Sequence, residues 1–381
     1  MIPTGGIRIG KFRGIEIYLH WSWFIIFFLL LWVVMQFFQL NLQSPPVRYI
    51  PMAIITTFFF FLSVLLHEMS HSVVANRNGV PIRRITLFVF GGVAQMSKDV
   101  TTPSVEFKMA IAGPLTSYAL SITFGLAAYV AGILRAGTIS FGFLLLAAVN
   151  FGLGTFNLIP GFPLDGGRVL RSFLWRRSGN LEKSTRTASR LGQGLAGLLV
   201  ISGITMILLD FVVPQYDLLL SGFWFILIGL FLFQAAVNSY RQVRIRTSLS
   251  HLKVGDLVRP GVPAVEASTT LEEVYRLHLQ NNPSSTVPVL QRGKLWGSIK
   301  LSDLKPFDPS AWSDTPAAHA AKATAREDAA DADQPLFEAF TLMERSGRDF
   351  LWVIDDGRLI GVVFREDARR LARESGGGNR P

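Results

Sequence analysis

Two histidines and a glutamate stand within five residues of one another in the segment LHEMSH, residues 66–71. If this segment is helical, His67 and His71 are four residues apart and project from the same face, one turn apart. Two imidazoles at that spacing can bind one zinc ion, and Glu68, beside the first of them, can take a proton from a zinc-bound water. The spacing therefore predicts zinc-assisted hydrolysis, with His67 and His71 as ligands and Glu68 as general base.

The surroundings of this motif strengthen the prediction. It ends the second of six stretches that are long and apolar enough to cross a bilayer. An ionisable side chain near the middle of such a span costs about 2.5–3.5 kcal/mol on insertion scales, so three of them in five residues require a functional reason. The alternative is that the motif lies just outside the membrane, in water. The six expected spans are residues 19–40, 52–75, 107–134, 141–159, 191–209 and 218–237.

Composition divides the chain into two parts. Of the 381 residues, 50% are hydrophobic, 17% are charged and none is cysteine. Residues 1–246 carry 20 Lys and Arg against 8 Asp and Glu, whereas residues 247–381 carry 17 against 19. The positive excess lies entirely in the apolar part, so it does not indicate a nucleic-acid partner. The absence of cysteine excludes a disulfide scaffold, a Cys-ligated metal and thiol catalysis.

The positive charges also predict an orientation. With the N-terminus inside, the outer loops carry only Arg48 and Arg135, and the other 18 basic residues of the apolar part fall inside. Short loops rich in Lys and Arg remain in the cytoplasm. We therefore expect a multi-pass protein of a prokaryotic cell membrane, embedded in the lipid bilayer, with both termini in the cytoplasm.

A third metal ligand is expected, because catalytic zinc usually has three protein ligands and a water. Cysteine is absent, three of the other histidines lie in the charged C-terminal part, and His20 lies at the interfacial start of the first span. Asp165 is the best candidate, in NLIPGFPLDGGR (157–168), which follows the fourth span on the side where His67 and His71 also end. The alternative is that Asp165 only caps a helix or turn. The prediction is one zinc per chain.

Two further patterns complete the outline. Residues 82–96, IRRITLFVFGGVAQM, are typical of a β-hairpin that lies at the membrane surface or dips into it, and the alternative is an ordinary cytoplasmic hairpin. The C-terminal part contains a weak repeat of strand, turn, strand and helix, which implies a paired α/β module. The expected domains are 1–246 in the membrane, 247–309 and the core 334–373 as the two repeats, 310–333 as a linker and 374–381 as a disordered tail.

Taken together, HEMSH in a span, FGG at 90–92, the Gly-Pro pair at 113–114 and NLIPGFPLDGGR resemble the site-2 protease family of intramembrane zinc metalloproteases. The resemblance covers about residues 1–240. It implies that His67, His71 and Asp165 ligate zinc, that Glu68 is the general base and that a transmembrane protein, such as a membrane-anchored regulator, is cleaved in regulated intramembrane proteolysis. Asn157 matches the motif's asparagine, and it either orients substrate or an oxyanion, or makes a simple interhelical hydrogen bond.

The C-terminal part resembles a pair of cystathionine-β-synthase-type (CBS) repeats. The family's ribose-contacting position falls on Asp303 and Asp367, which makes an adenosyl nucleotide a candidate ligand. Lys300 and Phe364 replace the usual Ser or Thr, so a regulatory or dimerising module, with a homodimer through the CBS repeats, is favoured. The alternative is that both aspartates merely cap the helices that follow.

The expected fold is a polytopic α-helical membrane protein of about six transmembrane helices with a membrane-associated β-hairpin, plus a cytosolic α/β CBS-pair domain. The expected function is intramembrane zinc endopeptidase. The alternatives are a CBS-gated transporter or channel, and a catalytically inactive scaffold, against which the complete set of site residues argues. A transporter should carry polar groups in several spans or an internal repeat among them.

Overall fold

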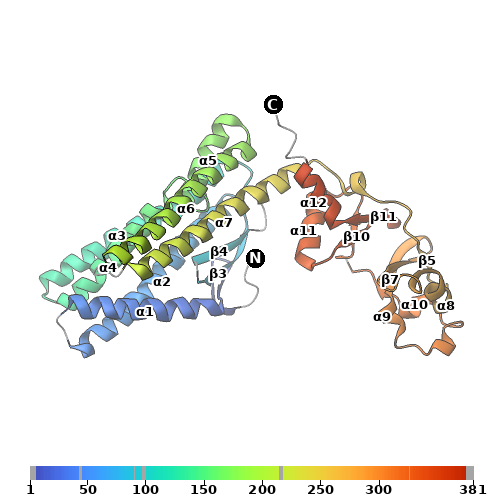
Figure 1. Cartoon of the computed structure of the whole chain (residues 1–381), viewed down its shortest axis with the longest axis horizontal. Helices are drawn as coiled ribbons and strands as arrows, with labels where there is room; N and C mark the ends of the chain where they lie inside the picture. Colours follow the sequence, from blue (N-terminus) through green and yellow to red (C-terminus); the bar gives the residue numbers. More distant parts are fainter. Residues whose placement is uncertain are drawn as a thin grey trace. The chain divides into compact units, whose positions relative to one another are not determined.

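A computed structural model of the chain describes residues 6–42, 45–89, 91–96, 100–213, 218–325 and 327–374. The chain divides into two compact units, Met1–Tyr240 and Arg241–Pro381. We call them the membrane unit and the C-terminal unit and describe each by itself (Figure 1).

Among the described residues, six helices are long and apolar enough to span a membrane, which confirms the six predicted spans. A shorter helix, α5 (Asp165–Ser178), stands between the fourth and fifth of them. The six are α1 (Trp21–Asn41), α2 (Pro46–Arg77), α3 (Pro103–Ile133), α4 (Gly137–Asn157), α6 (Leu181–Val212) and α7 (Leu219–Leu249).

Small residues allow these helices to pack closely. A Cβ built on Gly142 of α4 would lie 2.3 Å from the Met52 side chain of α2. One built on Gly203 of α6 would lie 2.5 Å from the carbonyl oxygen of Gly222 in α7. Membrane helices associate through such close contacts, because burying apolar surface gains little when lipid is the alternative. The Gly content of the predicted spans therefore reflects helix packing.

The predicted hairpin is present as β3 (Ile82–Phe88) and β4 (Gly91–Met96), which pair antiparallel. The structure adds two strands that the sequence pattern did not predict, β1 (Ile7–Phe12) and β2 (Ile15–Leu19). The sheet order is β1-β2-β3-β4, with β2 parallel to β3, so β4 forms one edge. Phe90, the first residue of the FGG motif, lies outside the described residues.

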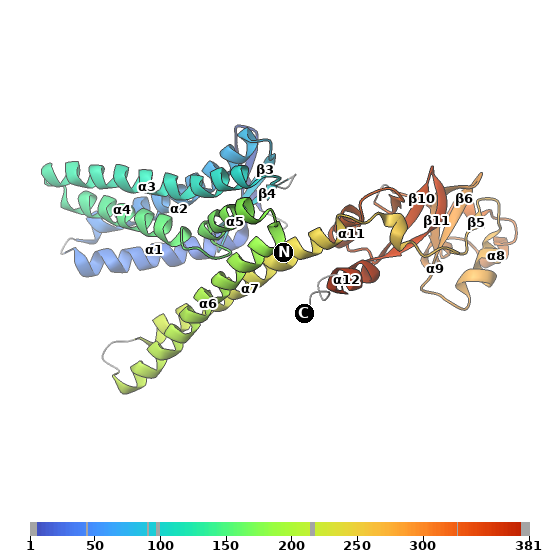
Figure 2. The same ribbon diagram turned by 90° about the horizontal axis from the view of Figure 1, so that it is seen from above.

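The sheet packs on the end of α2 that carries the HEMSH motif. Ile15, Ile85 and Leu87 share a buried cluster with Met69 and Ala75 of α2. Figure 2 shows α5 at the same end of the helix bundle as β3 and β4. The HEMSH segment, the sheet and α5 are thus brought to one end of the membrane unit.

The C-terminal unit contains two sheets, one for each repeat. The first has the order β5-β6-β7-β8 and the second β11-β10-β9. In both, a short parallel strand flanks an antiparallel pair. The strands are β5 (Val265–Glu266), β6 (Thr286–Gln291), β7 (Lys294–Lys300), β8 (Lys322–Ala323), β9 (Ala329–Asp331), β10 (Phe350–Asp355) and β11 (Arg358–Phe364).

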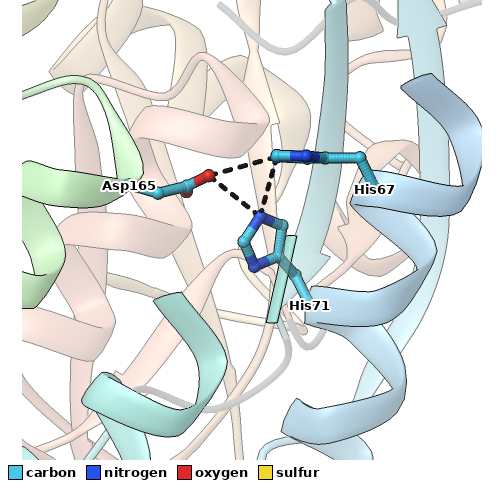
Figure 3. Close-up of side chains that lie close together, drawn as sticks. All are labelled: His67, His71 and Asp165. Carbon is cyan, nitrogen blue, oxygen red and sulfur yellow. Dashed lines mark hydrogen bonds and ion pairs between the residues drawn. The ribbon is translucent and has the colours of Figure 1, made fainter. Parts of the chain in front are cut away.

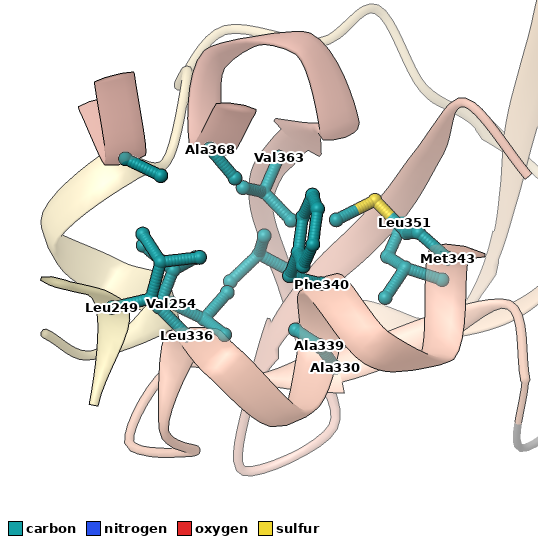
Figure 4. Close-up of a cluster of buried hydrophobic side chains, with 12 residues drawn as sticks. Leu249, Val254, Ala330, Leu336, Ala339, Phe340, Met343, Leu351, Val363 and Ala368 are labelled. Atoms are coloured by element: carbon teal, nitrogen blue, oxygen red, sulfur yellow. The ribbon is translucent and has the colours of Figure 1, made fainter. Parts of the chain in front are cut away.

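Each sheet carries helices over its own apolar core. In the second repeat, Phe340 and Met343 of α11 meet Leu351 and Val363 of the sheet (Figure 4). The helices are α8 (Leu271–Val274, continued by a π-helical turn over Tyr275–Leu279), α9 (Leu301–Leu304), α10 (Ala317–Ala320), α11 (Leu336–Ser346) and α12 (Arg365–Glu374).

The segment 310–333, expected as a linker, contributes to both cores. Ala317 and Ala320 of α10 are buried in the first cluster, and Ala330 of β9 is buried in the second. Its small side chains let the chain pass closely over each sheet. Of the expected disordered tail, residues 375–381 lie outside the described residues.

Candidate metal centre

The HEMSH motif lies within α2, so the helical spacing assumed for its histidines is observed. His67 and His71 are both buried, with 4% and 8% of their surface exposed. Their ring centroids are 4.9 Å apart, and the rings meet edge to face. Two imidazoles one turn apart therefore face the interior of the membrane unit from a single helix.

Asp165 completes the group from a different element. Its Oδ2 lies 3.1 Å from Nε2 of His67 and 3.1 Å from Nε2 of His71, and the two nitrogens are 3.2 Å apart (Figure 3). Asp165 is the first residue of α5, so the helix start places its carboxylate. Of the sequence-predicted site residues, these three are brought together at one point.

A tight loop holds the start of α5 in place. A Cβ on Gly166 would lie 2.3 Å from the Leu158 carbonyl oxygen, so only glycine fits where the loop passes. The Phe162 amide donates to the Ala188 carbonyl of α6, at 3.1 Å. A Cβ on Gly192, one turn further along α6, would lie 1.9 Å from the Phe162 carbonyl oxygen. The glycines of the motif thus serve close backbone contacts that fix Asp165.

A buried ion pair adds a second restraint on α5. Arg171 of α5 donates through Nε to Oε1 of Glu106 in α3, at 2.6 Å. Glu106 is only 2% exposed, so this pairing ties the two helices together at a point where an unpaired carboxylate would be costly. Neither residue was predicted to belong to the site.

The Nδ1 atom of each imidazole has a hydrogen-bonding partner. Nδ1 of His71 lies 2.6 Å from the Met109 carbonyl oxygen, and Nδ1 of His67 lies 2.9 Å from the Ser117 hydroxyl. A carbonyl only accepts, so Nδ1 of His71 must carry a proton, and in the neutral ring Nε2 then presents a lone pair. The Asp165 carboxylate and the two Nε2 atoms therefore converge on one point, where either a proton or a metal cation can bridge them.

The distances suit a zinc ion. Zinc binds histidine nitrogen and carboxylate oxygen at about 2.0–2.2 Å in tetrahedral sites, which places neighbouring ligand atoms about 3.3 Å apart. The separations of 3.1–3.2 Å found here are close to that edge length. The donor set of two nitrogens and one oxygen also matches the two-histidine, one-carboxylate type of catalytic zinc site.

The carboxylate of Asp165 is suited to a ligand role. Burial raises the pKa of its carboxyl group, but hydrogen bonds to His67 and His71, with the charge of Arg168, outweigh burial. The net effect holds the pKa of Asp165 well below its usual range. The group therefore remains an anion, as metal ligation requires.

Space for the ion comes from Gly113 of α3. A Cβ at this position would lie 2.2 Å from Nε2 of His71 and 2.5 Å from Nε2 of His67. Met109, Gly113 and Ser117 follow one another at intervals of four residues, so a single face of α3 both orients the imidazoles and leaves room between them. The Gly-Pro pair was noted in the sequence, but this role was not, and the equal spacing of the three residues is the signal that could have shown it.

Glu68 lies beside the sheet. A Cβ on Gly92 of β4 would lie 2.5 Å from Cγ of Glu68, so the backbone of the edge strand contacts this side chain. Gly92, the second glycine of the FGG motif, thus leaves room for Glu68. The HEMSH segment and the edge strand are therefore in contact at this point.

The remaining predicted site residues lie elsewhere. The amide of Asn157 donates to the Leu153 carbonyl of its own helix, at 3.0 Å, in place of the interhelical bond that was considered. Asp303 and Asp367 are buried in the C-terminal unit, where Asp303 pairs with Lys322 and Asp367 with Arg259, each at 2.5–2.7 Å. Asp303 also accepts from the Lys300 amide, as a helix cap would.

The fold and site together define a polytopic membrane protein with a buried two-histidine, one-aspartate centre and a soluble two-repeat module. Residues 55–140 and 127–201 match Peptidase family M50, and residues 254–307 and 324–374 match the CBS domain. The chain belongs to the M50 family of site-2 proteases and is a zinc metalloprotease with a CBS pair, as the resemblance implied.

Relatives match over nearly the whole chain. Rip3 of Mycobacterium tuberculosis, named as a zinc metalloprotease, is 32% identical over 96% of this chain and 92% of its own length. Zinc metalloprotease MJ0392 of Methanocaldococcus jannaschii is 30% identical over 96% and 95%. A solved structure, the site-2 protease from the same archaeon, is 31% identical over 62% of this chain and 95% of that one, with a TM-score of 0.40. The match to a peptidase family favours a protease over the transporter or channel alternative.

Proposed function

We propose that this chain is an intramembrane endopeptidase that hydrolyses a peptide bond within or near a transmembrane helix of another protein. The observation that carries the proposal is the convergence of His67, His71 and Asp165 on one point, buried at the end of a membrane span and adjacent to Glu68. The family supplies the reaction class, hydrolysis of peptide bonds with zinc.

In this proposal His67, His71 and Asp165 hold the zinc. When bound, zinc acts as a Lewis acid and makes a water-derived nucleophile available near neutral pH. Ser117 and Met109 fix the ring orientations, so that both Nε2 atoms face the ion. Glu68 accepts the proton that the attacking water loses and transfers it to the leaving amine. Asn157 is proposed, from the family motif, to orient the substrate or the oxyanion.

The edge of the sheet is proposed to present the substrate. A transmembrane helix shields its own peptide bonds, so it must unwind before attack, and strand β4 can pair with the unwound segment. The contact between Gly92 and Glu68 supports this arrangement, since a chain added beside β4 would run close to Glu68. Val93→Pro, which disrupts β4 at the residue opposite Thr86 of β3, should lower cleavage roughly tenfold with zinc content unchanged. Unaltered cleavage would eliminate this part of the proposal.

The natural substrate is proposed to be a membrane-anchored protein, such as a regulator released by proteolysis. The orientation with both termini in the cytoplasm follows from the charge asymmetry of the loops and would place the CBS pair there. The pair is proposed to regulate or dimerise the enzyme. Light scattering of the full chain in detergent tests dimerisation directly, and a monomer at every concentration would contradict it.

Glu68→Gln tests the proposed chemistry. The amide keeps the size of the side chain but cannot accept the proton, so cleavage of a transmembrane test substrate in liposomes should fall about 10²–10⁴-fold. Zinc content, measured on the same preparations, should remain that of the wild type. Glu16→Gln on β2 is the matched control and should cleave normally. If Glu68→Gln cleaves as fast as the wild type, the proposed mechanism is wrong.

A further inference from the structure

A groove of about 480 Å³ opens on the membrane unit, and the loop that precedes Asp165 forms part of its wall. The first turns of α3 supply Pro103 and Phe107, and the loop after α4 supplies Leu158 and Pro160. One face of α5 supplies the remaining wall. None of the proposed zinc ligands lines it, so the groove is separate from the metal centre.

The groove is apolar except at one end. Its only hydroxyl, that of Ser172, already donates to the Val169 carbonyl of its own helix, at 2.7 Å. Phe107 and Phe173 leave 46% and 61% of their surfaces exposed along it. The Arg176 guanidinium is the one charged group in the lining, and it makes no ion pair within the described part of the chain.

The order of these groups along α5 is informative. Gly166, Val169, Phe173 and Arg176 lie on one face of the helix, at successive turns. From Gly166 to Arg176 the helix rises about 15 Å, which equals half the thickness of a bilayer's hydrocarbon core, one leaflet. The groove is thus apolar over the length of one lipid tail and positively charged where that tail would end.

We propose that this groove binds a phospholipid with an anionic headgroup. One acyl chain lies along Val169 and Phe173, and Arg176 donates hydrogen bonds to the headgroup phosphate. A net negative headgroup is favoured because Arg176 has no ion-pair partner among the described residues, so the net charge of the headgroup is what balances it. This site stands independently of the proposed catalytic roles.

Native mass spectrometry of the delipidated full chain tests the proposal. The protein in detergent is titrated with phosphatidylglycerol and, separately, with phosphatidylcholine of the same acyl chains. The wild type should bind phosphatidylglycerol about fivefold more tightly, the effect of one basic residue at a lipid surface. Arg176→Gln should lose this preference. Arg177→Gln, the neighbouring residue that does not line the groove, should keep it.

Phe173→Gln examines the acyl part, and the exposure of this side chain makes the fold tolerant of the change. It should weaken both lipids equally, and a diazirine-bearing acyl chain should label residues 158–173 in the wild type. Equal affinity of the wild type for the two lipids would overturn the proposal. So would equal losses of the preference in Arg176→Gln and Arg177→Gln, which would indicate only a diffuse positive charge.

Discussion

Both units hold aspartates that are buried or partly buried, but the groups that balance the charge of these aspartates differ. In the C-terminal unit, Asp367 has Arg259 at 2.7 Å and Asp303 pairs with Lys322, so each acid has a cation from its own chain. In the membrane unit, Asp165 lies 3.1 Å from the Nε2 atoms of His67 and His71. The Nδ1 atom of His71 donates its proton to the Met109 carbonyl.

This is the difference expected between a structural acid and a proposed metal ligand. A buried charge is stable when the chain supplies its counter-ion with good geometry, and the pairs of the C-terminal unit satisfy this condition. In the membrane unit the partners of Asp165 are imidazole nitrogens, which can hold either a proton or a metal ion, so a cation from outside can take the place of the proton. The comparison therefore predicts that metal dependence is confined to the membrane unit.

The largest test of this contrast is Gly113→Ala. Its Cβ would lie 2.2–2.5 Å from both Nε2 atoms, in the space that the ion requires. We expect zinc content to fall to near zero and cleavage of a transmembrane substrate to be lost. Zinc is measured by mass spectrometry of the purified protein, and thermal unfolding should still show a folded chain.

Gly152→Ala is the matched control for that change. Gly152 lies in α4, where an added Cβ would meet no atom within 4 Å, and the two variants share any general effect of alanine in a membrane helix. Retention of full zinc by Gly113→Ala would show that the ion does not bind between these imidazoles.

A smaller loss is expected from Ser117→Ala. The variant removes the hydroxyl partner of His67 Nδ1 but leaves all three proposed ligands in place. Partners of this type change metal affinity by about 10–100-fold, so the wild type should retain zinc at chelator concentrations that strip the variant. Thr116→Val is the control, because the Thr116 hydroxyl donates only to its own helix, at the Ala112 carbonyl. Equal chelator sensitivity in both variants would count against an orienting role for Ser117.

The sequence predicted those parts of the site that local spacing encodes. His67 and His71 follow from an interval of four residues, and the position of Asp165 follows from sidedness and the absence of cysteine. Ser117 was missed because it meets His67 across 50 residues of chain, and no local pattern reports that contact. Gly113 was quoted as part of a motif, but its role became clear only from the structure, where a Cβ at this position would clash with the imidazoles of His67 and His71.

In the fold, too, the elements that local sequence encodes were predicted, and those that depend on distant contacts were not. Spans are set by about 20 apolar residues in a row, which a single pass along the chain detects. β1 and β2 were missed because β2 is only five residues long and pairs with β3 in parallel, from a distant part of the chain. Alanine-rich 310–333 resembled a linker because its buried residues are too small to give a hydrophobic signal.

The smallest effect is expected in the C-terminal unit, from Asp367→Asn. The variant removes one charge of a pair whose Arg259 partner is 58% exposed, so the unit should lose only about 1 kcal/mol of unfolding free energy. Zinc content and cleavage should match the wild type, because this acid has its own cation and binds no metal. Chemical denaturation of the full chain measures the loss, followed by tryptophan fluorescence, to which the buried Trp352 of β10 contributes. If zinc content falls as well, the two units are coupled through their buried acids and the contrast between them does not hold.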